Sequence, residues 1–127
     1  MRFASLVNGK VIPSEESESY TLAFWLRIHK ILFCHIPNEG KRSPRAGKRL
    51  KRMGLIAGAP DYLIFNPPPN SRNCGVAIEL KRVKGSEATE AQSVFLGQLR
   101  ANGWLSYVCY GADHAIRVLE DLGYGVK

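Results

Sequence analysis

Residues 76–83 read VAIELKRV, an alternation of apolar and polar side chains that is typical of a β-strand. Successive side chains of a strand point to opposite faces, so the large apolar residues share one face that would pack on a helix. Glu79 and Lys81 share the other face and point into the same space. We therefore predict a strand over residues 75–82 that carries an acid and a base side by side.

A second apolar stretch, YLIF at residues 62–65, precedes this strand, and the loop NPPPNSRN separates the two. Strands joined in this way pair as an antiparallel hairpin. A hairpin centred on Asn70 places Asp61 directly across from Glu79, where opposite Cβ atoms lie about 5 Å apart. Two carboxylates at that distance repel each other. A divalent cation would remove the repulsion, and oxygen ligands favour magnesium or manganese.

The rest of the chain predicts mainly helices. Ser14 is a suitable N-cap for a helix that we expect to run to about Phe33, and Pro44 suits the first turn of a second helix. The other expected elements are an extended lead-in over 1–13, a helix over 89–102, a strand over 104–110 and a helix over 112–122. This order predicts an α/β fold, a single domain over residues 1–127 with its core at about 14–122, in which helices flank a small mixed sheet.

Two polar residues lie on faces that the helical spacing predicts to be apolar. Glu18 shares a stripe with Leu22 and Trp25, and Gln92 lies with Phe95 on the inward face of a later helix. Buried polar groups need hydrogen-bond partners, and an acidic cluster or the water on its metal could supply them. The alternatives are that Glu18 serves only the helix dipole and that Gln92 binds only backbone.

Four of these motifs together match a known family. Glu18, the run AGAPD at 57–61, the run ELK at 79–81 and then Gln92 follow the order of the VRR-NUC domain, so the chain resembles that branch of the PD-(D/E)XK nuclease superfamily. The flanking sequence resembles its compact stand-alone members of phage and bacterial type, and the likeness spans about residues 14–122. Glu16 is the alternative to Glu18, because Ser19 stands where these proteins commonly have glutamine.

The resemblance implies a restriction-endonuclease-like fold and metal-dependent hydrolysis of phosphodiester bonds. It also implies that the ligands of one or two Mg²⁺ or Mn²⁺ ions are Glu18, Asp61, Glu79 and the backbone carbonyl of Leu80. Lys81 would position or activate the attacking water and stabilise negative charge in the transition state. Gln92 would orient water or a metal ligand.

Charge points to a polyanionic partner. The net charge is +7 and the isoelectric point about 9.6. The segment KRSPRAGKRLKR at 41–52 contains seven of the 18 basic residues and no acid, which predicts contact with DNA phosphates but no reading of bases. The predicted phosphate-binding residues are Lys41, Arg42, Arg45, Lys48, Arg49, Lys51 and Arg52.

Other classes of protein have little support. No stretch approaches the roughly 18 apolar residues that span a bilayer, and the N-terminus lacks a signal peptide, so we expect a cytoplasmic protein, inside the host cell if viral. Cys34, Cys74 and Cys109 are few and widely spaced, which favours free thiols over disulfides or a zinc site.

The leading functional prediction is a metal-dependent DNA nuclease, selective for branched or Holliday-junction-like DNA. Because a resolvase needs two active sites, we also predict a homodimer. Its contact surface is expected to be the apolar C-terminal set of Val118, Leu119, Leu122 and Tyr124. The alternatives are a non-catalytic basic DNA-binding module and a nuclease that acts on RNA.

Overall fold

The computed structural model describes residues 4–7, 10–37 and 43–125. Its elements, in chain order, are β1 (Ala4–Val7), β2 (Lys10–Pro13), α1 (Glu15–Ile28), β3 (Phe33–His35), α2 (Pro44–Arg52), β4 (Tyr62–Ile64), β5 (Val76–Lys81), α3 (Glu90–Ala101), β6 (Leu105–Tyr110) and α4 (Ala112–Asp121). The predicted mixed α/β architecture is confirmed.

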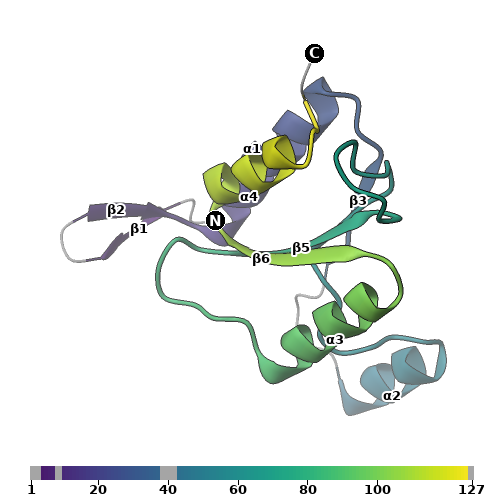
Figure 1. The fold of residues 1–127 in the computed structure, drawn as a ribbon. Coiled ribbons are helices and arrows are strands. Elements are labelled where there is room, and N and C mark those ends of the chain that lie inside the picture. The colour runs from purple at the N-terminus through teal and green to yellow at the C-terminus, as the bar shows by residue number, and fades with distance from the viewer. Residues whose placement is uncertain (1–3, 8–9, 38–42, 126–127) are drawn as a thin grey trace.

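The main sheet has the strand order β3-β4-β5-β6. Its first three strands pair antiparallel, whereas β5 and β6 run parallel and are connected through α3. Helices α1 and α4 lie together on one face of the sheet, and α3 covers the other (Figure 1). Helix α2 lies on the α3 side, away from the sheet. The predicted restriction-endonuclease-like arrangement of a small mixed sheet between helices is thus present.

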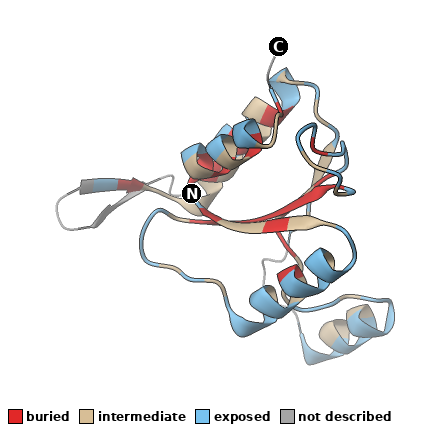
Figure 2. Cartoon of the chain, viewed as in Figure 1, coloured by how far each residue is buried: buried red, intermediate tan, exposed pale blue. Residues whose placement is uncertain are grey.

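The core lies between the sheet and the α1–α4 pair. Every residue of β5 is buried, as Figure 2 shows. The apolar face of β5 packs with Leu22 and Leu26 of α1 and with Leu119 of α4, all of them inaccessible to solvent. Ala77, Glu79 and Lys81 alternate with the apolar residues and face the side that α3 covers. The sequence pattern predicted this division correctly.

The helices begin where the sequence provides capping side chains. Ser14 accepts a hydrogen bond from the amide of Ser17, and Ser43 accepts one from Ala46 ahead of the proline that opens α2. Thr89 and Gln92 form a reciprocal capping box at the start of α3. These contacts fix the first turns of three helices, including the turn that carries Gln92.

The expected end of α1 at about Phe33 is wrong. The helix ends at Ile28, His29 is its C-cap, and Lys30 adopts a positive φ of 55°. The chain then reverses direction and enters β3, which the sequence analysis missed. A strand of three residues is too short to show a periodic pattern, and β3 exists through its pairing with β4. Within the expected extended lead-in over 1–13, the described residues form two strands, β1 and β2, that pair antiparallel.

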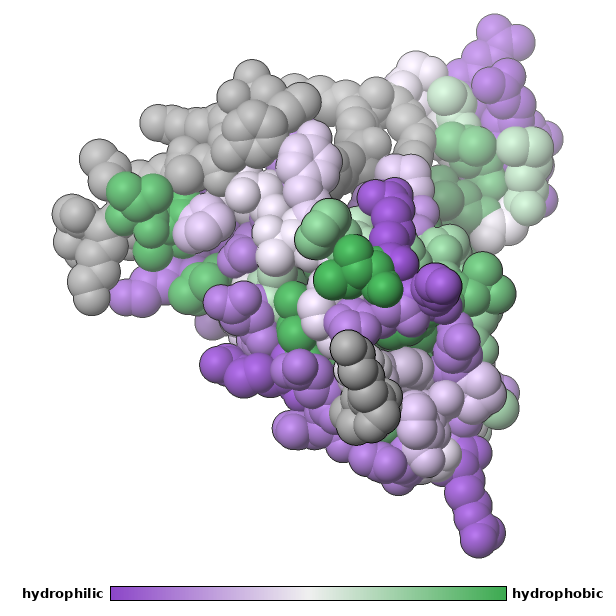
Figure 3. All heavy atoms as spheres, turned by 90° about the horizontal axis from the view of Figure 1, so that it is seen from above, coloured by the Kyte–Doolittle hydropathy of each residue, from purple (hydrophilic) through white to green (hydrophobic). Residues whose placement is uncertain are grey.

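The proposed C-terminal contact surface is also wrong. Leu119 and Tyr124 are buried in the core, and Val118 and Leu122 pack against it. These side chains, from α4 and the turn after it, therefore belong to the protein's own core. Viewed from the side of α4, the surface is mostly hydrophilic, with several separate hydrophobic patches (Figure 3). Among the described residues, no helix combines the length and apolar character needed to cross a bilayer.

Candidate active site

Asp61 and Glu79 meet at the start of β4, as the hairpin register predicted. Tyr62 pairs with Ile78 in that register, so the preceding residue Asp61 lies across from Glu79. The Oδ2 atom of Asp61 accepts a hydrogen bond of 2.7 Å from the backbone amide of Leu80. This bond anchors the Asp61 carboxylate against β5, next to the acid that precedes Leu80.

Glu79 is buried and only partly satisfied. Its side chain is 3% exposed, and its Oε1 atom accepts a 2.9 Å hydrogen bond from Nε2 of Gln92. The Nζ atom of Lys81, also buried, lies 3.7 Å from the same oxygen. The second oxygen, Oε2, is buried and has no hydrogen-bond partner among the described residues. A buried oxygen without a partner is costly, and this one is free to accept a ligand.

The environment disfavours two negative charges in the absence of a cation. Burial, followed by the charge of Asp61, raises the pKa of Glu79 to about 8, against the weaker opposing effect of Lys81. Burial also raises the pKa of Asp61, although the Leu80 amide lowers it. The acid pair therefore holds a proton near neutral pH, and a divalent cation can replace that proton. The donor set therefore fits a hard cation such as magnesium or manganese.

This pair makes the stability of the metal-free protein depend on pH. Because the pKa of Glu79 is raised from 4.5 to about 8 on folding, the folded state holds an extra proton between those values. The free energy of unfolding should therefore fall as pH rises through that range. Denaturant unfolding in EDTA at pH about 5.5 and about 8.5 measures the loss, and Glu79→Gln should reduce it. An equal loss in that variant would assign the pH dependence to other groups.

Gln92 bonds both to the acidic cluster and to backbone, the two alternatives that the sequence left open. Its Oε1 atom accepts a hydrogen bond from the Thr89 backbone amide, while its Nε2 atom donates to Glu79. The capping box thus holds the amide rigidly, and the amide in turn holds one carboxylate oxygen. The prediction that the acidic cluster partners Gln92 is confirmed.

Glu18 is buried, as predicted, but its carboxylate lies at the N-terminus of α4. Its Oε1 atom accepts a 3.2 Å hydrogen bond from the amide of Ala112, and a Cβ atom at Gly111 would approach Oε2 to 2.8 Å. Gly111 caps α4 without a side chain, so Glu18 supplies the anion that the helix dipole favours. Glu16, the alternative acid, instead accepts a hydrogen bond from the Tyr20 hydroxyl.

The described residues contain no group of three or more Asp, Glu, His or Cys side chains placed to share one ion. The structure brings Asp61, Glu79, Lys81 and Gln92 together, whereas Glu18 faces another helix. Leu80 lies between the two buried charged residues of β5, and its amide is occupied by Asp61. Glu18 and the Leu80 carbonyl as metal ligands therefore stay predictions.

His35 is a neighbour of the acid pair that sequence reasoning missed. It stands at the end of β3 opposite Tyr62, and its Nδ1 atom donates to the backbone carbonyl of Asp61 at 2.9 Å. Its charged form would lower the pKa of the Asp61 carboxyl. The sequence offers one weak signal for this role, a histidine directly before the Ile36-Pro37 break. The signal has meaning only once β3, which was not predicted, is known to pair with β4.

The segment before Asp61 is held by a close backbone approach at Gly58. Its φ is +87°, and a Cβ atom there would lie 2.4 Å from the carbonyl oxygen of Ala91 in α3. The left-handed conformation alone costs a residue with a side chain roughly 1–2 kcal/mol, and the contact with backbone adds to this. Gly58 thus keeps the chain that leads to Asp61 against the first turn of α3.

Gly58→Ala should lower the free energy of unfolding by about 2 kcal/mol or more. Gly97→Ala is the matched control, because a Cβ atom at this helical position meets nothing within 4 Å. Removing a helical glycine there should stabilise the protein by about 0.5–1 kcal/mol. Denaturant unfolding of both variants checks the opposite signs, and equal effects would contradict the tight approach at Gly58.

Pro44–Arg52 of the predicted basic segment forms α2, and its cations face solvent. Arg45, Lys48, Arg49, Lys51 and Arg52 are all exposed. Within the described part of the chain, none of these five makes an ion pair with a carboxylate. Lys41 and Arg42 lie outside the described residues. Unneutralised cations on one short helix make this surface suitable for binding a polyanion.

Comparison with known proteins identifies the family. The family model of the VRR-NUC domain matches residues 14–113, a range that includes all five predicted catalytic residues. A solved structure described as "VRR_NUC domain protein" superposes with a TM-score of 0.69 and 26% sequence identity, covering 87% of this chain and 91% of that one. A search of curated proteins finds no match. The chain belongs to the VRR-NUC domain family of nucleases.

Proposed function

We propose that this chain is a DNA nuclease that depends on magnesium or manganese, with Asp61, Glu79 and Lys81 at its centre. The observation that carries the proposal is the buried acid pair, in which Glu79 keeps one oxygen without a partner beside a buried lysine. Buried polar atoms normally have a hydrogen-bond partner, so this oxygen marks a position where a ligand is expected. Membership of a nuclease family supports the same assignment.

In this proposal Asp61, Glu79 and the Leu80 carbonyl would hold the cation, with Glu18 as a further ligand. A divalent ion at this position supplies charge stabilisation at the phosphate and lowers the pKa of a bound water. Lys81 positions the attacking water, and its charge stabilises the negative charge that develops on the phosphate. Gln92 keeps the Glu79 carboxylate in one orientation through its 2.9 Å hydrogen bond.

DNA is the proposed substrate because the domain that contains the acid pair also presents the exposed cations of α2. The basic residues of α2, together with Lys41 and Arg42 before it, would contact phosphates. Such contacts fix position along a strand but do not read bases. We therefore propose selection by DNA structure, with branched or junction DNA as the preferred form, rather than by sequence.

The test is cleavage of labelled junction, flap and duplex DNA with Mg²⁺ or Mn²⁺ and again with EDTA. The proposal expects strand cutting that stops with the chelator and that favours the branched substrates. Binding without cutting under every metal condition would instead identify a DNA-binding module. A competing RNA substrate that is cut in preference to DNA would overturn the choice of polymer.

A homodimer remains part of the proposal, and α1 offers a surface for it. Tyr20, Phe24 and Ile28 form an apolar stripe along the helix and are each more than half exposed. The first turn of α1 is acidic and its last turn contains Arg27. Antiparallel pairing of α1 with a second copy would therefore cover the stripe and set unlike charges against each other.

Phe24→Lys should convert the dimer into a monomer, because it places a charge at the centre of the stripe. Val94→Lys is the control, since Val94 is similarly exposed but lies on α3. Light scattering after size-exclusion chromatography measures the mass of each variant. The surface is wrong if Phe24→Lys stays dimeric, and the homodimer itself is wrong if the parent chain is a monomer.

A further inference from the structure

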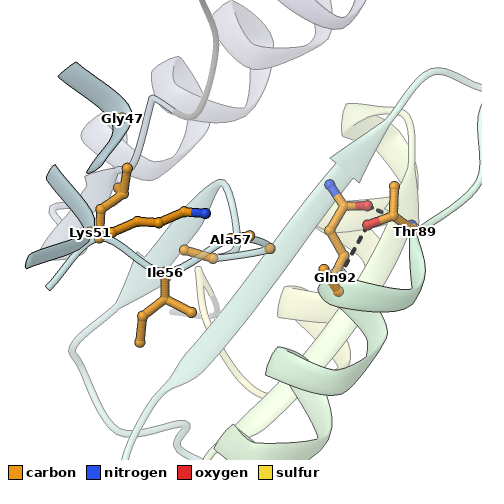
Figure 4. Close-up of a pocket in the computed structure, with 10 residues that line it drawn as sticks. Gly47, Lys51, Ile56, Ala57, Thr89 and Gln92 are labelled. Atoms are coloured by element: carbon orange, nitrogen blue, oxygen red, sulfur yellow. Dashed lines mark hydrogen bonds between the residues drawn. The ribbon is translucent and has the colours of Figure 1, made fainter. Parts of the chain in front are cut away.

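A cleft of about 480 Å³ separates α2 from the first turn of α3. In Figure 4, Lys51 extends from α2 toward the segment that contains Ala57, and Gln92 lies on the far side of that segment. The wall is largely apolar, with Leu55, Ile56, Ala57 and Ala91 among its residues. Among the described residues that line the cleft, Lys51 is the one that carries a charge.

The cleft adjoins the acid pair along two routes. The lining segment continues from Ala59 through Pro60 directly to Asp61. Gln92 also lines the cleft, and the same side chain donates to Glu79. A group bound in the cleft therefore lies next to the position where a phosphate would meet the carboxylates.

The close approach at Gly58 keeps this cleft preformed. The backbone of Gly58 packs against that of Ala91, which leaves no room there for a side chain. The wall of the cleft is thus fixed to the helix that holds Gln92. A preformed site loses less conformational entropy when a ligand binds.

The chemistry of the cleft suits one nucleotide better than a duplex. Its volume is in the range of about 300–1,000 Å³ that is typical of pockets for small molecules. A lysine at the mouth can bind a phosphate, and an apolar wall can contact a base or sugar that has left its stack. The cleft has no aromatic lining residue among the described ones, so base stacking is not its means of recognition.

We propose that this cleft holds a single unpaired nucleotide of the DNA strand that is cut, with Lys51 on its phosphate. The inference rests on the proposed nuclease function and gives it a substrate class, which is DNA that is unpaired beside the scissile bond. It also supplies a physical reason for structure selectivity. A continuous duplex would have to open before a nucleotide could enter.

The test is binding of labelled single-stranded DNA and of a duplex of the same length, measured in EDTA so that nothing is cut. Ala57→Leu narrows the cleft from an exposed position without adding an aromatic ring that could stack on a base. It should weaken single-strand binding about tenfold or more, which corresponds to roughly 1.4 kcal/mol. Duplex binding should change less than about twofold, since it relies on the exposed cations of α2. Ala101→Leu, an exposed position at the far end of α3, should change neither.

Lys51→Ala gives an independent reading. If Lys51 contacts one phosphate of the strand, the variant should lower the slope of log affinity against log salt concentration by about 0.7 for single-stranded DNA. Lys48→Ala removes the same charge from α2 outside the cleft and tests for a general charge effect. The cleft contact is supported if Lys51→Ala lowers this slope for single-stranded DNA more than Lys48→Ala does. Equal reductions of the slope count against it.

Unchanged single-strand affinity in Ala57→Leu, or equal weakening of single-strand and duplex binding, would overturn the inference. So would a parent chain that does not bind single-stranded DNA. Because metal is absent from this assay, a chain that binds as expected but never cuts would refute the proposed function. It would leave standing only that the cleft binds an unpaired nucleotide.

Discussion

Lys81→Ala is expected to reduce DNA cleavage on the order of a thousandfold, equivalent to about 4 kcal/mol in the barrier. The side chain is buried and its Nζ atom lies 3.7 Å from the Glu79 carboxylate, so no neighbouring cation can replace it from solvent. DNA binding should be nearly unchanged, because the exposed cations of α2 remain. Cleavage rates and anisotropy on the same junction DNA measure the two effects separately.

Two controls make this result specific. Lys84→Ala removes the same charge from an exposed position three residues later, and should cut at close to the parent rate. Lys81→Met keeps most of the buried volume without the charge. It should be as inactive as Lys81→Ala, but its unfolding midpoint should be similar to that of the parent. A Lys81→Met variant that cuts like the parent would remove Lys81 from the proposed centre.

The position of the acid pair could be predicted from sequence because it depends on local rules. Alternation along β5 places Glu79 and Lys81 on one face, and the length of the intervening loop sets Asp61 opposite Glu79. Helical spacing likewise placed Gln92 on the inward face of α3. Each of these inferences uses residues that are close in the chain or joined by a single hairpin.

The features that sequence reasoning missed depend on contacts between distant segments. His35 reaches Asp61 only because β3 pairs with β4, and a three-residue strand has no periodicity to reveal it. The partner of Glu18 follows from the packing of α1 against α4, which brings it to the amide of Ala112. Spacing alone showed that Glu18 is inward-facing, but not which helix end it meets.

The predicted C-terminal contact surface was wrong for the same reason, because it also depends on contacts between distant segments. The spacing of Val118, Leu119 and Leu122 indicates an apolar face but cannot tell whether that face meets the chain's own sheet or another molecule. Here it meets the sheet. The apolar side chains that do face solvent on α1, such as Phe24, follow an equally regular spacing. Only the three-dimensional arrangement distinguishes the two.

Asp61→Asn should slow cleavage on the order of a thousandfold and at the same time preserve or raise the stability of the metal-free protein. The asparagine side-chain oxygen can still accept the hydrogen bond from the Leu80 amide, so the local fold has a reason to persist. Loss of the Asp61 charge removes a repulsion that raises the pKa of Glu79. A single carboxylate, however, binds a divalent cation much more weakly than a pair does.

Thermal unfolding with EDTA and with Mn²⁺ separates these effects. The parent should gain stability from the ion by mass action, whereas Asp61→Asn should gain little and should cut on the order of a thousandfold more slowly. Asp121→Asn, which removes an exposed carboxylate at the end of α4, should behave like the parent in both assays. If Asp61→Asn cuts normally, the carboxylate pair is not the catalytic centre. If it loses cutting but keeps the full stabilisation by Mn²⁺, the ion binds elsewhere and Asp61 acts on the substrate directly.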